Sequence, residues 1–552
     1  MTATGLGADA ATAAGSPAAP AEGRRPWWVW TVPSVLLFAL LCARNRFLFT
    51  AHLYEQGDAG ANSILIEQAR HFTLLVGNYS RERFHHPGPA YMYVQAFGEY
   101  LFRDALHVVP TAWNAHMLSV FALNAAFVAM AVAIVYGWTR SLRGAVACLA
   151  VFAAFAAAYP PILNSDWMPY MYVVPYMVFV LAAGSVAAGC ARDAWIFAAS
   201  GWLLIHGQAC FLLFVPVMTV AVLAAVLWPR RRRLRASVGA FFRTQRGTWI
   251  PVAAISAAFL LPIVVNLVLH WPGDFGKYVS YGTSSRAGGH GLGRIIRYAL
   301  WFWLPHRPAW QAGLAVVLGA GAAIAVSLGL AGGRLRRFAL ALLAVNGVST
   351  LTFLLYAAVG IDDITDHYIG YFYWSAPLVT VLVIMLGLVG PAGARGRRRE
   401  GRAAAPGARP LRGSPGRSGL LGVGAAALAA VAAFTALAVI PGTRTSTKDI
   451  DDSLPRVVAT LAAQAHGRPI VLHIDPLTWV EATGFLVQAE RTGVRACLDD
   501  SWFTFLVTRQ FICTPAQAAG GRGYWFYAPG GLPRGTPALL RFSGITVARA
   551  PS

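Results

Sequence analysis

The sequence predicts an all-α polytopic membrane protein with a small α/β domain at its C-terminal end. Of the 552 residues, 57% are hydrophobic and only 12% are charged. These proportions are typical of a chain that crosses a bilayer many times and exclude an ordinary soluble protein of this length. Apolar runs of roughly the 20 residues that a bilayer requires recur along the chain. After residue 443 the pattern changes, and helical segments alternate with short apolar strands.

We expect about 11 transmembrane helices of this length. They cover residues 27–48, 113–138, 144–160, 169–190, 194–207, 209–228, 249–270, 309–331, 338–360, 369–390 and 419–440. The tail 1–23 has almost no large apolar side chains and is expected to be disordered. The membrane domain then runs from 24 to 440. Its first span is interpreted as a signal anchor, because no small-residue cleavage site is evident.

The distribution of arginine residues predicts how the chain is oriented in the membrane. The net charge of +22 comes from short arginine blocks between apolar runs, so it indicates membrane topology and not a nucleic-acid partner. With the N-terminus in the cytoplasm, every inner loop is basic, as the positive-inside rule requires. The basic stretch 391–418 is then a cytoplasmic linker that contacts anionic membrane lipids. The odd number of spans places the C-terminal domain outside the cell membrane.

The first outer loop, 50–112, is expected to contain two helices that lie in the membrane interface. Residues 63–76 repeat apolar side chains at helical spacing along one face. Residues 90–103 are mostly apolar but carry polar side chains at four-residue steps from Gln95 to Arg103, a stripe typical of an interfacial helix. The alternative is that both segments are ordinary packing helices.

Asp58 lies in this loop between Gly57 and Gly60, which let the backbone turn tightly and approach a ligand. A carboxylate at the outer surface can accept the proton of an attacking hydroxyl, so Asp58 is the candidate catalytic base. The alternative is that Asp58 caps the helix that follows it, since aspartate is a favoured N-cap residue.

The segment 81–89 contains the candidate phosphate site. Arg81, Arg83, His85 and His86 are expected to form a compact cationic patch that is rich in hydrogen-bond donors. Guanidinium groups bind phosphate oxygens through paired hydrogen bonds, so the patch would suit the phosphate of a lipid carrier. The alternative is that the arginines contact lipid headgroups without binding a specific ligand.

Further polar residues lie in the other outer loops, which are pinned between spans and face the outer water interface. Six of them are assigned to the lining of the same cavity on their loop positions alone. They are Asp166, His206, Gln208, Asp366, His367 and Tyr368.

A divalent metal ion is the one cofactor for which these loops carry suitable ligand residues. The aspartates of the stretch 362–366, His367 and the pair His85-His86 have suitable ligand types. However, the sequence has no HxxxH or HExxH pattern, and adjacent histidines point apart. We therefore expect no protein-built metal site. The alternative is an ion that chelates a pyrophosphate.

Residues 443–552 form the predicted extracytoplasmic α/β domain. Its expected helices are 453–465 and 477–492, and its expected strands are 469–475, 494–498, 511–513 and 524–528. In an oxidising compartment Cys497 and Cys513 could form a disulfide. Closing a loop of about 15 residues would stabilise the domain by roughly 3 kcal/mol in the chain-entropy model. The alternative is two buried free thiols.

These features together resemble the GT-C superfamily of membrane glycosyltransferases. The shared features are a first helix that starts inside, a long outer loop with an early aspartate, two interfacial helices, short-looped spans and an extracytoplasmic C-terminal domain. The stretch Phe84-His85-His86-Pro87-Gly88-Pro89-Ala90-Tyr91 resembles one in uncharacterised bacterial, often actinobacterial, members. The likeness covers the membrane domain, roughly 27–440.

The resemblance implies an inverting hexosyl- or pentosyltransferase. Its donor would be a polyprenyl-phosphate sugar, and its acceptor a glycan, lipid or protein outside the membrane. Asp58 would be the base, while Arg81, Arg83 and the two histidines would hold the donor phosphate. The paired acidic Asp-x-Asp or Glu-x-Asp of some subfamilies is absent, because Gln56 and Gly57 precede Asp58. Its absence weakens the case for a metal-dependent mechanism.

Two other classes stay open. A transporter or lipid flippase would carry ionisable residues near the middle of its spans and would show related halves. Few charges lie within the expected spans, and no internal repeat is evident. A non-catalytic cell-envelope scaffold would require Asp58 to point away from the arginine and histidine cluster.

Overall fold

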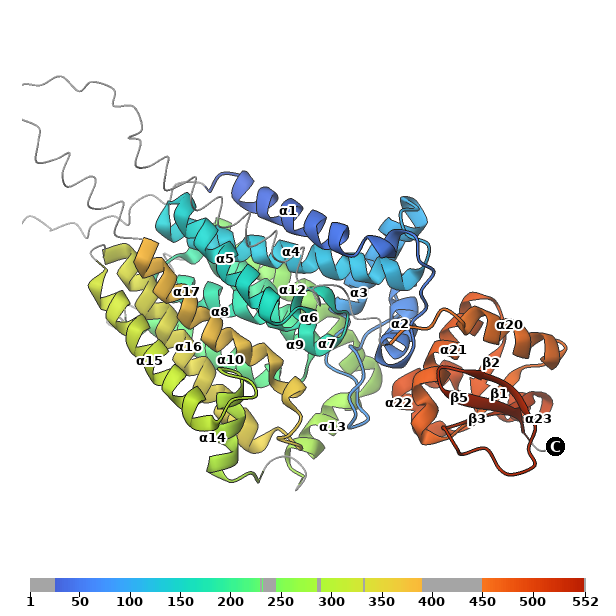
Figure 1. Ribbon diagram of the computed structural model, residues 1–552. Coiled ribbons are helices and arrows are strands. Elements are labelled where there is room, and N and C mark those ends of the chain that lie inside the picture. The colour runs from blue at the N-terminus through green and yellow to red at the C-terminus, as the bar shows by residue number, and fades with distance from the viewer. Residues whose placement is uncertain are drawn as a thin grey trace, which may run out of the picture.

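The computed structural model describes residues 25–228, 231, 245–284, 289–330, 333–389 and 449–550. A bundle of helices forms one part of the molecule, and an α/β domain lies against one end of it (Figure 1). The expected disordered tail 1–23, the basic linker 391–418 and the last expected span, 419–440, lie outside the described residues.

Within the described residues, six helical stretches are long and apolar enough to cross a membrane. They are α4 (Ala112–Thr139), α7 with α8 (Met168–Ala187), α12 (Arg246–His270), α15 (Ala309–Gly329), α16 (Gly333–Val359) and η5 with α17 (His367–Leu388). The shorter apolar helices are α1 (Trp28–Arg44), α5 (Leu142–Ala158), α9 (Ala194–Gly207) and α10 (Phe211–Leu227). Every expected span up to residue 390 thus contains a helix, and the chain is a multi-pass membrane protein.

Burial divides these helices into inner and outer ones. Helix α8 (Val173–Ala187) is buried at every position from Val173 to Ser185, so it forms the centre of the bundle. In the most apolar stretch of each helix, only 11% of the residues of α12 and 17% of the residues of α15 are buried. Their apolar side chains remain uncovered by protein, as in helices that face lipid.

Helix α2 (Gly57–Arg70) differs from the helix expected over 63–76. It begins earlier, at a glycine whose φ of +58° other residues rarely adopt, and it is buried on two sides. Ile64 packs in the core of the C-terminal domain, whereas Leu65 packs in the core of the helix bundle. α2 is therefore a packing helix between the two parts of the chain, not a helix on the membrane surface.

The polar stripe of the second expected helix is also buried. Helix α3 (Ala90–Gly98) continues into a π-helical turn, η2 (Glu99–Ala105). The Glu99 side chain is 1% exposed, and its carboxylate lies 2.9 Å from Arg70, 2.6 Å from Arg103 and 2.8 Å from His116. A buried carboxylate needs such partners, so the stripe forms an internal ionic cluster and does not face the membrane interface.

The C-terminal domain is built on one five-stranded sheet in the order β2-β1-β3-β5-β4. Its parallel strands are β1 (Ile470–Ile474), β2 (Ala496–Leu498) and β3 (Arg522–Tyr527). Its antiparallel hairpin consists of β4 (Ala538–Phe542) and β5 (Ile545–Arg549). Helices α20 (Leu454–Ala465) and α21 (Trp479–Arg491) contact β1. They bury the side chains of one face of the sheet.

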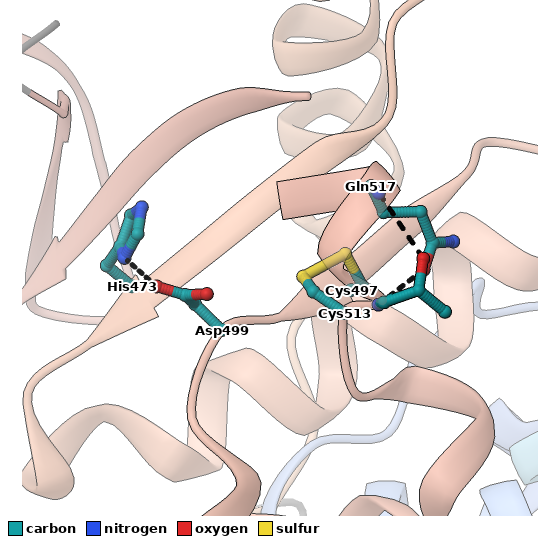
Figure 2. The surroundings of a disulfide bond; sticks show 6 residues. His473, Cys497, Asp499, Cys513 and Gln517 are labelled. Atoms are coloured by element: carbon teal, nitrogen blue, oxygen red, sulfur yellow. Dashed lines mark hydrogen bonds and ion pairs between the residues drawn. A yellow bond between two sulfur atoms is a disulfide. The ribbon is translucent and has the colours of Figure 1, made fainter. Parts of the chain in front are cut away.

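The sequence predicted both helices and all three parallel strands of this domain near their observed positions. It missed the β4–β5 hairpin, whose turn at Ser543-Gly544 has positive φ at both residues, as two-residue hairpin turns require. It also predicted a strand at 511–513, where the chain leaves a 3₁₀ turn and makes a single bridge to β2. Cys497 and Cys513 are joined in a disulfide, which ties this segment to β2 (Figure 2).

A buried ion pair joins the C-terminal domain to the segment that leads into α2. Glu55 is completely buried, and Arg491 of α21 contacts its carboxylate at 2.8 Å. The Ser63 hydroxyl donates to the same carboxylate at 2.5 Å, and the Thr483 hydroxyl donates to the carbonyl of Gly57 at 3.2 Å. These contacts hold the C-terminal domain against the first turn of α2.

Candidate active site

A cavity of about 340 Å³ lies where the segment between α1 and α4 meets the ends of several helices. Its walls come from α2, the segment 78–86, the start of α7, the α9–α10 turn, α13 (Gly273–Gly282) and the end of α16. The predicted residues that line it are Asp58, Arg81, His86, Gln208 and Tyr368. Aromatic lining comes from Tyr79, Phe84, Trp167, Tyr172, Tyr278, Tyr281 and Tyr356.

Asp58 lies in the first turn of α2 and accepts two side-chain hydrogen bonds. The Tyr79 hydroxyl donates to Oδ1, and Trp167 Nε1 donates to Oδ2 at 2.7 Å. The N-cap residue is Gln56, and no side chain caps the helix, so the capping alternative for Asp58 is wrong. A carboxylate held in one orientation, with lone pairs still free, is suited to act as a general base.

Tyr79 and Trp167 are site residues that the sequence analysis missed. Burial, followed by the neighbouring Asp58 carboxylate, raises the pKa of Tyr79 well above its usual value. The phenol therefore stays protonated and donates to Asp58. Neither residue belongs to a local motif, and only their position beside Asp58 in space identifies them.

Asn62 was also missed. It lies one turn after Asp58 on the same side of α2 and lines the cavity. It is 5% exposed, and its Oδ1 has no hydrogen-bond partner among the described residues. A buried amide without a partner is costly unless a ligand satisfies it. The four-residue spacing from Asp58 is the signal that could have identified it.

Arg81 is bound to two acidic residues. Its Nη2 donates to Asp362 at 2.6 Å, and its Nη1 donates to Asp366 at 2.5 Å and to the Tyr368 hydroxyl at 3.0 Å. Burial alone would lower the pKa of Arg81, but the bonds to Asp366 and Asp362 raise it above its usual value. The guanidinium thus stays charged, and its charge is balanced by carboxylates.

His86 lines the cavity but does not contribute the positive charge expected of it. Burial lowers its pKa to about 3, so the ring is neutral near pH 7. The backbone N–H of Ala209 donates to His86 Nδ1 at 3.2 Å. This bond leaves the ring proton on Nε2, which makes His86 an uncharged hydrogen-bond donor.

Arg83 and His85 do not line this cavity. The guanidinium of Arg83 lies 5.7 Å from the ring centroid of Trp502 in the C-terminal domain. The ring of His85 lies 3.5 Å from the carboxylate of Asp274 in α13. The four-residue cationic patch predicted from the sequence is therefore wrong, because partners from distant segments draw these two side chains elsewhere.

His206 does not line the cavity but holds the loop that does. Its Nδ1 accepts the backbone N–H of Ala90 at 3.3 Å, and its Nε2 bonds to the carbonyl of Phe259 at 2.9 Å. A Cβ on Gly88 would lie 2.3 Å from the His206 ring, so only glycine fits there. The His-Pro-Gly-Pro stretch thus packs the segment between α2 and α3 onto the end of α9.

The other predicted residues lie outside the lining of the cavity. Asp166 accepts the indole N–H of Trp113 at 2.8 Å, and burial raises its pKa to about 6. His367 stacks on Trp301 with centroids 4.1 Å apart. Asp366 lies outside the lining, and its carboxylate binds Arg81, which lines the cavity.

No group of three or more His, Cys, Asp or Glu side chains in the described part of the chain is arranged to hold a metal ion. The carboxylates of Asp362 and Asp366 bind Arg81, and His86 Nδ1 accepts from the backbone. The ligand types noted in the sequence therefore already have protein partners.

No family model and no curated protein match the chain. Two crystal structures of ArnT from Cupriavidus metallidurans are similar to it. The form bound to undecaprenyl phosphate has a TM-score of 0.53 at 14% identity, over 95% of this chain and 98% of that chain. The apo form has a TM-score of 0.51 at 14% identity, over 93% and 97%. At this identity the likeness shows the fold alone: the chain shares the overall fold of these two ArnT structures over nearly its whole length.

Proposed function

We propose that the chain is an inverting membrane glycosyltransferase that moves a sugar from a polyprenyl-phosphate donor to a glycan, lipid or protein acceptor. The observation that carries the proposal is that Asp58 and Arg81 line one cavity, with a base for the acceptor and a cation for the donor. The similar ArnT fold, with undecaprenyl phosphate bound, supports a polyprenyl-phosphate donor.

Asp58 would act on the acceptor. Tyr79 and Trp167 orient its carboxylate, and the acceptor hydroxyl would pass its proton to Asp58 as its oxygen attacks the anomeric carbon. The new glycosidic bond forms while the bond from that carbon to the phosphate oxygen breaks. A single displacement of this kind inverts the anomeric configuration.

Arg81 and His86 would act on the leaving phosphate. The Arg81 fork binds two carboxylates in this structure, and a donor phosphate could replace one of them with the same paired geometry. His86 would add an uncharged N–H. A divalent ion chelated by the donor phosphates is the alternative source of positive charge, and loss of transfer in EDTA with recovery in Mg²⁺ would favour it.

In this proposal the cavity lies on the outer side of the cell membrane. The N-terminus is then cytoplasmic and the C-terminal domain is extracytoplasmic. The same orientation places the Cys497–Cys513 disulfide in an oxidising compartment, where such bonds persist.

The test is to incubate the detergent-solubilised protein with a panel of hexosyl and pentosyl polyprenyl phosphates and to measure released polyprenyl phosphate. Donor binding is measured in parallel. Release with one donor that is lost in Asp58→Asn, but kept in the exposed control Asp452→Asn, would support the enzyme. Release unimpaired in Asp58→Asn would remove Asp58 as the base. Absence of both release and donor binding would favour the transporter or scaffold classes.

A further inference from the structure

A loop of the C-terminal domain packs against the ring of Tyr79, whose hydroxyl donates to the proposed base Asp58. The rings of Phe505 and Tyr79 have centroids 6.0 Å apart and planes 60° apart. The Tyr79 ring packs against the hydrophobic core of the C-terminal domain, and the same residue lines the cavity. One side chain thus connects this domain to the carboxylate of Asp58.

The loop that carries Phe505 covers residues 499–512 and follows β2. It contains η7 (Ser501–Phe503), α22 (Thr504–Val507) and η8 (Arg509–Phe511). The Cys497–Cys513 disulfide closes the loop at its base, and the backbone N–H of Cys513 donates to the carbonyl of Leu498 at 3.0 Å. Closing a loop in this way removes conformational freedom from it, so the backbone that carries Phe505 is held in place.

The two faces of this loop have different neighbours. One face is buried in the core of the C-terminal domain and consists of Phe503, Leu506, Val507 and Phe511. On the other face, Trp502 lies 5.7 Å from the guanidinium of Arg83. The Gln68 amide of α2 donates to Thr508 at 3.5 Å and to Gln510 at 3.4 Å. Figure 1 shows α22 on the side of the domain that faces the helix bundle. The loop is therefore anchored on both faces.

The two donors that orient Asp58 are held by different parts of the chain. Trp167, next to the start of α7 in the helix bundle, donates to Oδ2 at 2.7 Å. Tyr79 is held by its bridge to His85 and by the ring of Phe505. The Phe505 side chain has no polar atom, so it can affect a reaction at Asp58 only through its packing. Truncating it to alanine would open space beside the Tyr79 ring, which could then leave its rotamer.

We propose that Phe505 is a positioning residue for sugar transfer, because it holds Tyr79 in the rotamer that brings the phenol to Asp58. The inference rests on the proposed function, in which Asp58 is the base. It gives the C-terminal domain a part in the reaction, since its loop 499–512 sets the direction of the base carboxylate. Loss of the Phe505 ring should lower the rate of transfer and leave the affinity for the donor, which binds at Arg81, unchanged.

The first test observes the Tyr79 ring directly and requires no activity. Meta-fluorotyrosine is placed at position 79 of the full-length protein by amber suppression, and its fluorine NMR signal is recorded in detergent. We expect Phe505→Ala to move the signal toward that of free fluorotyrosine, because the ring loses a neighbour. Phe505→Leu keeps an apolar group there and should move the signal less. Tyr527→Ala is the matched control, since its ring packs on Trp525 in the sheet, and it should leave the signal unchanged.

The second test measures release of polyprenyl phosphate. Phe505→Ala should lower kcat about tenfold with an unchanged donor KM, and Phe505→Leu should recover part of the loss. In a Tyr79→Phe background, Phe505→Ala should cause no further loss, because the hydrogen bond that Phe505 supports is already absent. Losses that add in the double variant would overturn the proposal, since Phe505 would then act on the fold and not through Tyr79. If Phe505→Ala does not fold, the same cycle is run with Phe505→Leu.

Failure of this inference is separable from failure of the proposed function. An unchanged fluorine signal in Phe505→Ala would overturn the inference even if the protein transfers sugar. A shifted signal in a protein that transfers no sugar would retain Phe505 as the residue that holds Tyr79 and would remove the proposed function instead.

Discussion

The hydroxyl of Tyr79 donates a hydrogen bond to Oδ1 of Asp58. The bond depends on a narrow turn, because Tyr79 and His85 form an antiparallel bridge that folds the segment between them back toward α2. The proposed base is thus oriented by the same segment that carries Arg81. One short stretch of chain thus carries both Arg81 and the phenol that bonds to Asp58.

Tyr79→Phe should lower kcat by about 10- to 100-fold, because a hydrogen bond to a charged group is worth about 1.5–3 kcal/mol. The donor KM should change little, since the phenol does not contact Arg81. Release of polyprenyl phosphate measures both quantities. Tyr100→Phe, at an exposed position of η2, is the matched control. An unchanged kcat in Tyr79→Phe would show that this bond does not orient the base.

Asn62→Ala should weaken the binding of the acceptor without destabilising the protein. If the unpartnered amide bonds to the acceptor, its loss should raise the acceptor KM about tenfold, a cost of about 1.4 kcal/mol. The donor KM should not change. The thermal midpoint should stay level or rise, because the buried amide has no protein partner to lose. A midpoint that falls together with activity would instead indicate a structural role.

Substitutions of Arg81 and of Asp362 should have opposite effects on the donor KM. Arg81→Lys should raise the donor KM about tenfold or more, because an ammonium lacks the paired geometry of guanidinium. Asp362→Asn should lower the donor KM, since it removes a carboxylate that competes with phosphate for Arg81. Asp363→Asn is the control, because Asp363 bonds to Thr365 instead. A donor KM that rises in Asp362→Asn would mean that the carboxylate positions Arg81 for the donor.

Local signals made the membrane helices and most of the C-terminal domain predictable. A long apolar run identifies a buried or spanning helix wherever it occurs. The candidate site was only partly predictable, because its chemistry depends on contacts between distant segments. Asp58 and Arg81 were identified by residue type, whereas Tyr79, Trp167 and Asn62 were not.

The His-His-Pro-Gly-Pro stretch shows the same limit. Its composition indicated a special local structure, and the structure gives the reason: Gly88 packs directly on the His206 ring. The sequence could not show that burial leaves His86 neutral, since a pKa is set by the surroundings of a side chain and not by its neighbours in the chain.

The stability of the protein should depend on pH through Asp166. Burial raises its pKa in the folded state to about 6, above the value of about 3.9 expected in the unfolded chain. Between these values the folded state binds more protons, so the free energy of unfolding should fall as pH rises from about 4 to 6.

Asp166→Asn should remove this pH-dependent loss of stability. The asparagine side chain has no proton to lose, and its amide oxygen can still accept the Trp113 N–H. We expect a gain on the order of 3 kcal/mol at pH 7, from a pKa difference of about two units, and a much smaller gain at pH 4, measured as shifts of the thermal midpoint in detergent. The exposed Asp452→Asn should show neither gain. A gain of equal size at both pH values would contradict an origin in ionisation.

Arg491→Met should uncouple the C-terminal domain from α2 and the residues that lead into it. The substitution leaves the completely buried Glu55 carboxylate without its cation, a change that typically costs about 3–5 kcal/mol. The readouts are thermal unfolding and the rate at which a protease separates the two parts of the chain. Activity should fall as well, because the first turn of α2, which carries Asp58, begins only two residues after Glu55.

The control is Arg495→Met, since Arg495 is exposed and, among the described residues, its side chain donates only to the carbonyl of Gly467; its effect should stay within about 0.5 kcal/mol. The double variant Glu55→Gln with Arg491→Met separates charge from packing. If the cost is that of an unpaired buried carboxylate, the double variant should be more stable than Arg491→Met alone. If it is less stable, packing of the arginine stem against α2 holds the two parts together, and the ion pair contributes little.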